Sequence, residues 1–473
     1  METTALKAAI SYESKLVRRN GLFYFFIFGV LGILSVLIPW TRDWIFWENV
    51  AFASSIPIRG VYFLNLFQSL IVIFIICDIE RKRRKAETRE VLSARPIGNR
   101  QSLLGEFLGI LVPFLAVDII FILVCVVIGI IIPDSPVNLW VNLFYLLTLV
   151  LPTLVFIIGL SLLVNKLFKQ PFISWVTLTA FLYFACNYWV TPLYGILDFR
   201  GSLLPSSFST LIGFVYLEDY LLQRFVFLFL GIGFLCFAVL FAKRKPNTSD
   251  RKCYLIVPAS LFLVLALVLG GIYVGKFQAR LENRIAYRET FLKYNEYPTS
   301  RVLTHDVTYH PGGEKFSATS RMSIQNRKKV KMDKLLLFLN PGLEIGKIES
   351  NGQSLSFSRD YQVIVIDHPL APGEEIELEV EYEGRIDEDI YQVNIPDDEF
   401  FSPAARYSQK ENYGRRRAFV SSGFTLLVPE VMWYPMTVPP VELQASKEIN
   451  FTDYTLHVKN PGEMTVLSQG TPT

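Results

Sequence analysis

Apolar residues are concentrated between positions 21 and 275, and the pattern changes after that point. A helix needs ~20 mostly apolar residues to cross the hydrocarbon core of a membrane. Seven runs are this long or nearly so: 22–40, 58–79, 106–132, 139–164, 172–190, 224–242 and 254–275. Residues 276–473 instead contain short segments in which apolar and polar positions alternate, as in half-buried strands. The chain therefore predicts a polytopic α-helical membrane domain of about seven spans, followed by an all-β, sandwich-like domain.

The clearest strand pattern is "EIELEVEYEG" at 375–384, where five glutamates alternate with Ile376, Leu378, Val380 and Tyr382. This alternation predicts one buried face and one solvated acidic face, not an acid–base site. Shorter apolar segments precede it, separated by turn signals at 340–342, 351–352 and 371–373. Several short strands at this spacing are typical of a β-sandwich.

Composition supports this division. Hydrophobic residues make up 51% of the 473 residues and the mean hydropathy is +0.35, more than a soluble protein usually hides in its core. The net charge is +3, and no basic patch interleaved with aromatics points to nucleic acid. All five cysteines precede residue 254, which excludes a disulfide framework or a cysteine-based zinc site in the later half. The first 20 residues lack the early apolar core of a cleavable signal.

The distribution of Lys and Arg between the apolar runs predicts the orientation. With the N-terminus inside, the inner segments carry nineteen of these residues and the outer segments carry four. Cytoplasmic segments are enriched in Lys and Arg. We therefore expect a plasma (inner) membrane protein with a cytoplasmic N-terminus and with residues 276–473 extracytoplasmic.

The longest inner loop follows the second apolar run and reads "CDIERKRRKAETREVLSARPIGNRQSLLGEF" from Cys77 to Phe107. Its basic run, Arg81 to Lys85, is typical of a stop-transfer anchor near anionic lipid headgroups. Helix-forming residues then continue to Leu92, and Pro96-Ile97-Gly98 interrupts them. This order predicts a short helix along the cytoplasmic face.

The segment from Glu90 to Ile97, followed by "LGEFLG" at 104–109, resembles the stretch between spans two and three of ABC-2 type permeases. Glu106 departs from that pattern, because lysine is common there. The resemblance covers about residues 10–245 and implies a coupling helix that docks on a cytoplasmic ATP-binding subunit. It makes Glu90, Leu92, Arg95 and Pro96 candidate coupling residues, and it implies a second permease copy or homologue as a partner. No GxxxxGK[ST] motif occurs in the chain, so ATP would be bound by the partner subunit and this chain carries no cofactor of its own.

Two polar residues lie within apolar runs and are candidates for function. Asp118 lies inside the third run and Asn187 near the end of the fifth. Each has two interpretations, a hydrogen bond in the bundle interior or a role on a transport path. The semi-apolar loop from Thr191 to Arg224 likewise predicts either an interfacial helix or the pair of half-helices that the ABC-2 resemblance implies.

The second half carries a different resemblance. "LLLFLNPGLEIGKIESNGQSLSFSRDYQVIVIDHPLAPGEEIELEVEYEGRI", the Trp-Tyr-Pro within Ser421–Pro440, and Asp453–Gly470 together resemble the N-terminal β-domain of M1 family zinc aminopeptidases over about residues 280–470. Catalysis in that family needs HExxH and a further carboxylate ligand. The four histidines are His305, His310, His368 and His457, and none begins such a motif. The GxMEN motif is also absent. We expect no catalytic or metal-binding residue here, zinc only if a catalytic domain follows, and His305 and His310 on the surface.

These patterns predict four segments: a cytoplasmic N-terminus at 1–20, an ABC-2-like permease domain at 21–245, a seventh span with a helical stalk at 246–300, and an M1-like β-domain at 301–473. The leading hypothesis is the permease subunit of an ABC-2 type transporter, in contact with membrane lipid and driven by a separate ATPase. One alternative is a membrane anchor that presents the β-domain without transport. Another is the front part of a longer membrane-bound zinc aminopeptidase, in which case the whole protein would be an M1 metallopeptidase.

Overall fold

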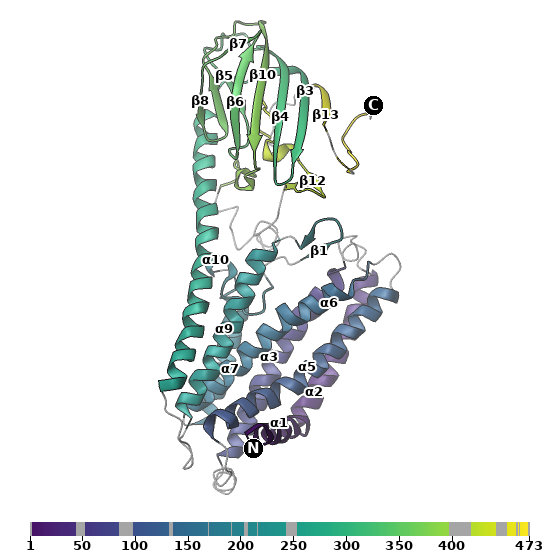
Figure 1. The fold of residues 1–473 in the computed structure, drawn as a ribbon, viewed down its shortest axis with the longest axis vertical. Helices are drawn as coiled ribbons and strands as arrows, with labels where there is room; N and C mark the ends of the chain where they lie inside the picture. The colour runs from purple at the N-terminus through teal and green to yellow at the C-terminus, as the bar shows by residue number, and fades with distance from the viewer. Residues whose placement is uncertain are drawn as a thin grey trace. The chain divides into compact units, whose positions relative to one another are not determined.

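The structure, a computed structural model, forms two compact units, Met1–Lys276 and Phe277–Thr473 (Figure 1). It describes residues 2–43, 53–84, 98–131, 136–168, 170–190, 192–202, 207–214, 216–242, 253–396, 418–440, 452–459, 462 and 464–471. The first unit is helical and the second is rich in β-strands.

The helical unit is built from helices that follow the apolar runs of the sequence. They are α1 (Glu2–Arg18), α2 (Gly21–Asp43), α3 (Ser55–Arg83), α5 (Asn99–Ile131), α6 (Leu139–Tyr145), α7 (Leu151–Leu167), α8 (Pro171–Asn187), α9 (Leu217–Phe241) and the first part of α10 (Cys253–Tyr294). A π-helical turn, η2 (Leu146–Val150), joins α6 to α7. All seven predicted runs are therefore helical.

Five helices of the described chain are long and apolar enough to cross a membrane: α3, α5, α6–α7 taken together, α9 and α10. The helix pair α1–α2, bent by 68°, would add a sixth. Helix α8 is apolar but has only 17 residues. Length and composition thus support several spans, fewer than the seven that the sequence predicts.

The loop before α9 differs from both sequence-based expectations. Its described residues contain a single 3-10 turn, η3 (Pro192–Gly195), and a small hairpin of β1 (Phe208–Ser209) and β2 (Gly213–Phe214). Leu193 and Tyr194 in η3 have positive φ angles. Neither an interfacial helix nor two half-helices form in residues 192–202 and 207–214, because the left-handed residues and the hairpin turn the chain too tightly for a longer helix. Residues 217–224 of the same predicted segment are helical, as the start of α9.

Two glycines bring α7 and α9 into backbone contact. A Cβ atom on Gly159 would lie 2.3 Å from the carbonyl oxygen of Gly231, and one on Gly231 would lie 2.7 Å from the Cα of Phe156. Small residues allow this close packing of helices that share an apolar environment.

The second unit contains two main sheets. The larger has the order β13-β3-β4-β10-β6-β7 and the smaller has the order β5-β9-β8. The strands are β3 (Arg301–Gly312), β4 (Lys315–Gln325), β5 (Leu335–Phe338), β6 (Leu343–Ser350), β7 (Gln353–Ser354), β8 (Phe357–Asp360), β9 (Val363–Ile366), β10 (Glu375–Gly384), β11 (Phe419–Val420), β12 (Thr425–Leu426) and β13 (Asp453–Val458), with short turns η4 (Glu388–Ile390) and η5 (Pro429–Val431). Strand β13 pairs with β3 in parallel, and the other pairs are antiparallel.

The small sheet is buried on both faces, which adds a third layer to the predicted sandwich. Leu335, Leu337, Ile364 and Ile366 belong to the core shared with the large sheet. Their neighbours on the opposite face pack with Tyr287 of α10. The continuous apolar runs of β5 and β9 are typical of strands covered on both sides. The end of α10 is therefore part of the core of the β-rich unit.

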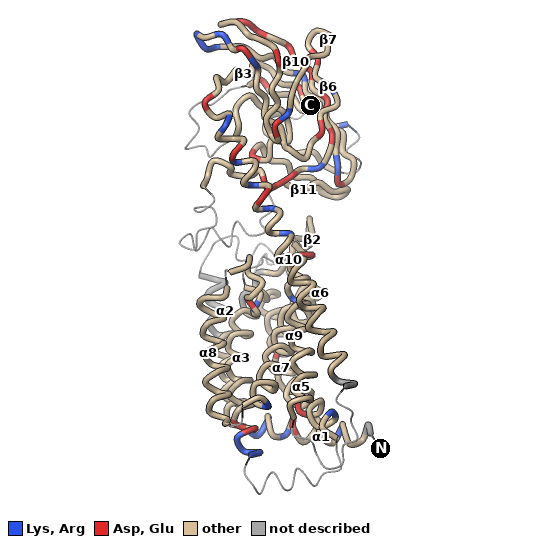
Figure 2. The backbone as a smooth tube through the Cα atoms, turned by 90° about the vertical axis from the view of Figure 1, so that its left-hand side faces the viewer, with Lys and Arg blue, Asp and Glu red and all other residues tan. Residues whose placement is uncertain are grey.

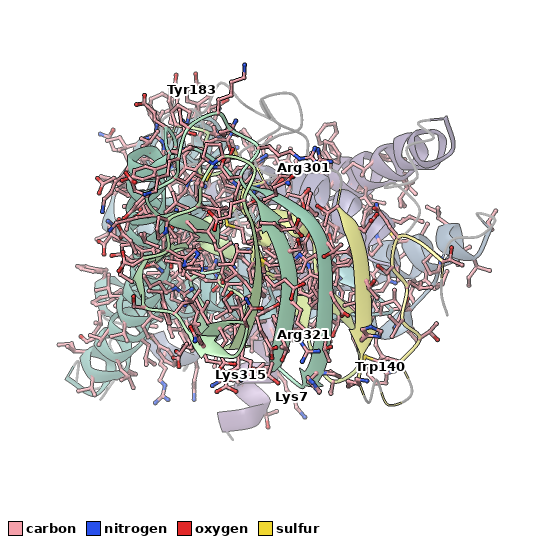
Figure 3. The ribbon with its side chains drawn as sticks, turned by 90° about the horizontal axis from the view of Figure 1, so that it is seen from above. Lys7, Trp140, Tyr183, Arg301, Lys315 and Arg321 are labelled. Carbon is pink, nitrogen blue, oxygen red and sulfur yellow. The ribbon has the colours of Figure 1, made fainter. Side chains whose placement is uncertain are left out.

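The large sheet confirms the predicted alternation of β10. Ile376, Leu378, Val380 and Tyr382 are buried, and the glutamates between them are exposed or half-buried. On that outer face Arg321 of β4 (Figure 3) pairs with Glu379 at 3.1 Å. The acidic face is therefore a solvated surface, as expected, and the structure adds an ion pair on it.

Candidate functional site

The two ends of the helical unit differ in chemistry. Figure 2 shows Lys and Arg gathered at the end that carries α1. Exposed aromatic side chains include Trp140 at the start of α6 and Tyr183 near the end of α8 (Figure 3), and Tyr24 near the start of α2. A basic end is typical of the cytoplasmic side of a membrane protein, and exposed Trp and Tyr are typical of the membrane–water interface.

Helix α1 docks on α5 through a pair of glycines. A Cβ atom on Gly105 would lie 2.6 Å from the Cβ of Ala9, and one on Gly109 would lie 2.3 Å from the Cβ of Glu13. The two glycines are four residues apart and so share one face of α5. This close approach brings the side chain of Glu13 to the ends of α3 and α5.

Substitution of Gly109 by alanine tests this docking. We expect Gly109→Ala to destabilise the contact of α1 with α5 by about 1–3 kcal/mol, because the new methyl group overpacks the interface. Hydrogen exchange of the α1 amides in the full chain measures the effect. Gly271→Ala is the matched control: Gly271 also lies inside a helix, but no atom lies within 4 Å of its Cβ position. The control should stabilise its helix by about 0.5–1 kcal/mol, and equal exchange in both variants would contradict the docking.

A buried cluster of charges connects four helices at this end. Arg83 of α3 pairs with Glu13 of α1 and with Glu106 of α5, and also with Glu80 at 3.1 Å. Lys166 of α7 pairs with Glu80 at 2.6 Å and with Glu106 at 3.8 Å. No side chain of the five is more than 18% exposed. The cluster therefore holds three carboxylates and two cations away from bulk water.

The basic run at the end of α3 is divided between protein contacts and exposed groups. Arg84 donates to the carbonyl oxygens of Asn165 and Phe168, at 2.6 and 3.1 Å, and so caps the end of α7. Arg81 and Lys82 are exposed and pair with Asp78. Half of the described run is thus structural, which the stop-transfer interpretation did not anticipate.

The candidate coupling residues Glu90, Leu92, Arg95 and Pro96 lie outside the described residues. The structure describes the two boundaries of their segment instead. The preceding residues Arg83 and Arg84 are bound to α1, α5 and α7, and α5 begins directly after the segment at Asn99. The cluster therefore holds together the helices that precede and follow residues 85–97.

The two polar candidates within the apolar runs lie in different surroundings. Asp118 is fully buried in α5 and accepts a hydrogen bond from Gln68 of α3 at 2.8 Å. Asn187 lies at the exposed end of α8, where its amide donates to the carbonyl oxygen of Tyr183 at 2.8 Å. The structure does not bring these two residues together, and only Asp118 lies in the bundle interior.

The described residues contain no group of three or more His, Cys, Asp or Glu side chains placed to hold a metal ion.

The histidines of β3 correct one expectation of the sequence analysis. His310 is exposed, but His305 is only 4% exposed. A register shift between Val302 and Thr304 turns His305 inward, where Ser320 lies 3.1 Å from Nε2 and the rings of Tyr434 and Tyr454 pack against the imidazole. Sequence alternation alone does not locate such a bulge.

Burial lowers the pKa of His305 to about 4, so the β-rich unit should lose stability in acid. The unfolded chain takes up a proton near pH 6.5 that the folded chain excludes until about pH 4. Stability is therefore complete above pH 6.5 and falls by up to ~3 kcal/mol as the pH drops through this window. Urea unfolding of the full chain, followed by hydrogen exchange of β3 and β4, should show this fall in the wild type and in His310→Gln, but not in His305→Gln. A fall of equal size in His305→Gln would contradict it.

Comparison with known proteins gives partial similarities to metallopeptidases. No family model matches the sequence, and no curated protein matches it. Among solved structures, an M1 zinc metallopeptidase from Deinococcus radiodurans is 22% identical over 19% of this chain and 21% of its own, with a TM-score of 0.18. A mutant from the same organism, bound to a Tyr-Ser-Ala substrate, is 18% identical over 34% of this chain and 32% of its own, with a TM-score of 0.25. Native leukotriene A4 hydrolase from Saccharomyces cerevisiae is 15% identical over 19% of this chain and 15% of its own, with a TM-score of 0.16. The chain thus spans about a third or less of the length of these proteins. The ABC-2 resemblance rests on the sequence motif alone.

Proposed function

We propose that this chain is the permease subunit of an ABC-2 type transporter, inserted in the plasma (inner) membrane and driven by a separate ATP-binding subunit. The observation that carries the proposal is the buried charge cluster at the boundaries of residues 85–97. Arg83 precedes this segment and is held by Glu13 and Glu106. A segment that must transmit the movement of a partner needs a rigid base, and ion pairs among four helices supply one.

The segment itself has the chemistry of a docking surface. Arg95 can pair with carboxylates of a partner, and Leu92 can fill a shallow groove beside it. Glu90 and Pro96 complete the pattern that resembles ABC-2 permeases. The described residues that flank the segment lie at the basic end of the helical unit, which supports a cytoplasmic partner. A second copy of the chain, or a homologue, would complete the membrane assembly.

The β-rich unit is proposed to be an extracytoplasmic module without chemistry of its own. Its strands match the segments that resemble the N-terminal domain of M1 aminopeptidases, and HExxH is absent from the sequence. Zinc enters this proposal only with a catalytic domain in a longer protein. The alternative function, a membrane anchor without transport, is favoured by one observation: Tyr287 and Phe291 of α10 are part of the core of the β-rich unit, so that unit is built on its own helix.

Charge reversal in the coupling segment distinguishes the two functions. In the full chain, Glu90→Lys with Arg95→Glu should abolish co-purification of the ATP-binding subunit from native membranes and the ATPase activity that accompanies it. The control, Arg251→Glu with Lys252→Glu, reverses a basic pair predicted on the same side but outside the motif. Loss in the first variant and retention in the control supports the permease. If ATPase activity never accompanies the wild-type chain, or if the first variant retains it, the anchor is favoured.

Orientation has an independent test. In a chain whose five native cysteines are replaced by serine, a membrane-impermeant maleimide should label Ser358→Cys in intact cells and leave Lys7→Cys unlabelled. Both positions are exposed in the structure. The reverse pattern of labelling would overturn the proposed topology.

A further inference from the structure

The interior of the helical unit contains an acid without a counter-charge. Asp118 has no solvent-exposed surface. Its Oδ2 atom accepts a hydrogen bond from Nε2 of Gln68 at 2.8 Å, and its Oδ1 atom has no hydrogen-bond partner among the described residues. Within the described part of the chain, the amide of Gln68 is the one polar group that interacts with this carboxyl group.

The helices packed against α5 are α1, α2, α3, α6–α7 and α9. The titratable and charged side chains described on them and on α5 are Lys7, Tyr12, Glu13, Lys15, Arg18, Tyr24, Tyr62, Cys77, Asp78, Glu80, Arg81, Lys82, Arg83, Arg100, Glu106, Cys125, Tyr145, Lys166, Glu218, Asp219, Tyr220, Arg224 and Cys236. None of these cations forms an ion pair with Asp118. Glu106, the other acid of α5, lies twelve residues away along the helix, about 18 Å at 1.5 Å per residue.

A series of hydrogen-bonded polar groups begins one helical turn from Gln68, at Asn65, and ends at the cation Arg224. Asn65 lies one turn before Gln68 on α3, and its amide donates to Thr153 of α7 at 3.4 Å. The oxygen of the Asn65 amide is also buried without a partner among the described residues. The guanidinium group of Arg224 on α9 lies 3.4 Å from the hydroxyl of Thr153. Arg224 also donates a hydrogen bond to the carbonyl oxygen of Phe199 at 2.9 Å. Each acceptor along this series is neutral.

These contacts favour a neutral form of Asp118. An ionised carboxylate in a dry, apolar interior is strongly disfavoured unless it is paired, and one amide donor does not replace a counter-ion. A protonated carboxyl group carries no charge, and its hydroxyl is a donor, so it would also remove one of the two buried acceptors that lack a partner. Gln68 still donates to the other oxygen in that form.

We propose that Asp118 and Gln68 form a proton-binding site inside the helical unit, in which the Asp118 carboxyl group is neutral at pH 7. Gln68 orients the carboxyl group through Oδ2. Asn65 and Thr153 supply polar groups that lead from the site toward the loop at Asp198 and Phe199. This site does not depend on the permease function, because it follows from burial and pairing alone.

Infrared spectroscopy of the full-length protein in lipid vesicles tests the site. At pH 7 the difference between wild type and Asp118→Asn should contain the carbonyl band of a protonated carboxylic acid, which the variant has lost. Glu377→Gln, at an exposed position of β10, should instead lose ionised carboxylate absorption. Gln68→Leu should keep the protonated band but shift its frequency, since the hydrogen bond to Oδ2 is gone. If Asp118→Asn loses ionised carboxylate absorption, as the control does, the proposal is overturned.

Two further measurements use the same proteins. Because the folded chain holds a proton that the unfolded chain releases, alkaline pH should lower the melting temperature of the wild type more than that of Asp118→Asn. An equal response of both proteins would contradict the site. Sodium or potassium chloride added at constant pH should leave the protonated band unchanged. Replacement of that band by carboxylate absorption would show that Asp118 binds a metal cation, which overturns the assignment to a proton.

Discussion

Arg83→Met should destabilise the helical unit by about 3–5 kcal/mol, because removal of one partner from a buried ion pair leaves the opposite charges uncompensated. Without Arg83, Glu80 and Glu106 would keep only Lys166 as a partner, and Glu13 would lose the ion pair that it forms with Arg83. Methionine retains much of the side-chain volume, so the charge is the main change. Thermal unfolding of the purified full chain gives the overall loss, and hydrogen exchange of residues 2–18 shows whether α1 leaves α5.

The neighbouring Arg81 supplies the control. It lies on the same helix, but its side chain is 70% exposed and its partner is Asp78. Exposed pairs of this kind contribute about 0–1 kcal/mol, so Arg81→Met should leave α1 in place. Adding Glu13→Gln to Arg83→Met should recover part of the loss, because one uncompensated charge is removed. If the two arginine variants behave alike, the buried cluster does not hold the helices together.

Hydrophobic periodicity located the helices of the first unit, because an apolar run reports burial or lipid contact wherever it occurs. It did not distinguish a helix long enough to span from a shorter one. Pro171 and Asn187 mark the ends of α8, and the preceding loop and the turn after Asn187 limit its length. The positive φ angles of Leu193 and Tyr194 carry no sequence signature, since neither residue favours that conformation.

The charge cluster was beyond sequence analysis for a different reason. Its members come from four helices, and an ion pair between residues 13 and 83 depends on how those helices pack. One signal was present in the sequence. Glu106 departs from the lysine common in ABC-2 permeases, and Gly105 and Gly109 flank it. The two glycines indicate a closely packed neighbouring helix, which is α1, and the acid between them indicates a nearby cation, which Arg83 of α3 supplies.

In the β-rich unit, the alternation of apolar and polar residues located β10 and most of the strands that precede it. It did not show which strand faces are covered by other parts of the unit. The runs in β5 and β9 are apolar on both faces because α10 covers the outer one, and this was open to inference from the sequence. The sequence analysis placed His305 on the surface, although histidine is only intermediate in its preference for exposure. The bulge after Val302 that turns it inward depends on pairing with β4.

Asn340 connects the segment 418–440 to the sheets. The sequence analysis identified this residue only as part of the turn signal at 340–342. Asn340 has no exposed surface. Its amide donates to the carbonyl oxygens of Val431 and Asp387 at 2.7 and 2.9 Å. Its side-chain oxygen, Oδ1, accepts hydrogen bonds from the backbone N–H groups of Asp387 and Gly342 at 2.8 and 2.9 Å. One side chain thus satisfies four backbone groups from three segments.

Asn340→Leu should therefore cost the β-rich unit about 3–5 kcal/mol, since four backbone groups, one buried and three partly buried, are left without this partner and a buried group in that position costs about 1–3 kcal/mol. Stabilities of this size are a large fraction of what a domain of this kind possesses, so we expect loss of protection throughout β5, β6 and residues 429–436. Hydrogen exchange of the full chain measures this. Gln353→Leu is the control, because Gln353 is exposed in the short strand β7, and it should change protection little. Retention of full protection in Asn340→Leu would mean that the two sheets, and not this side chain, hold the 418–440 segment in place.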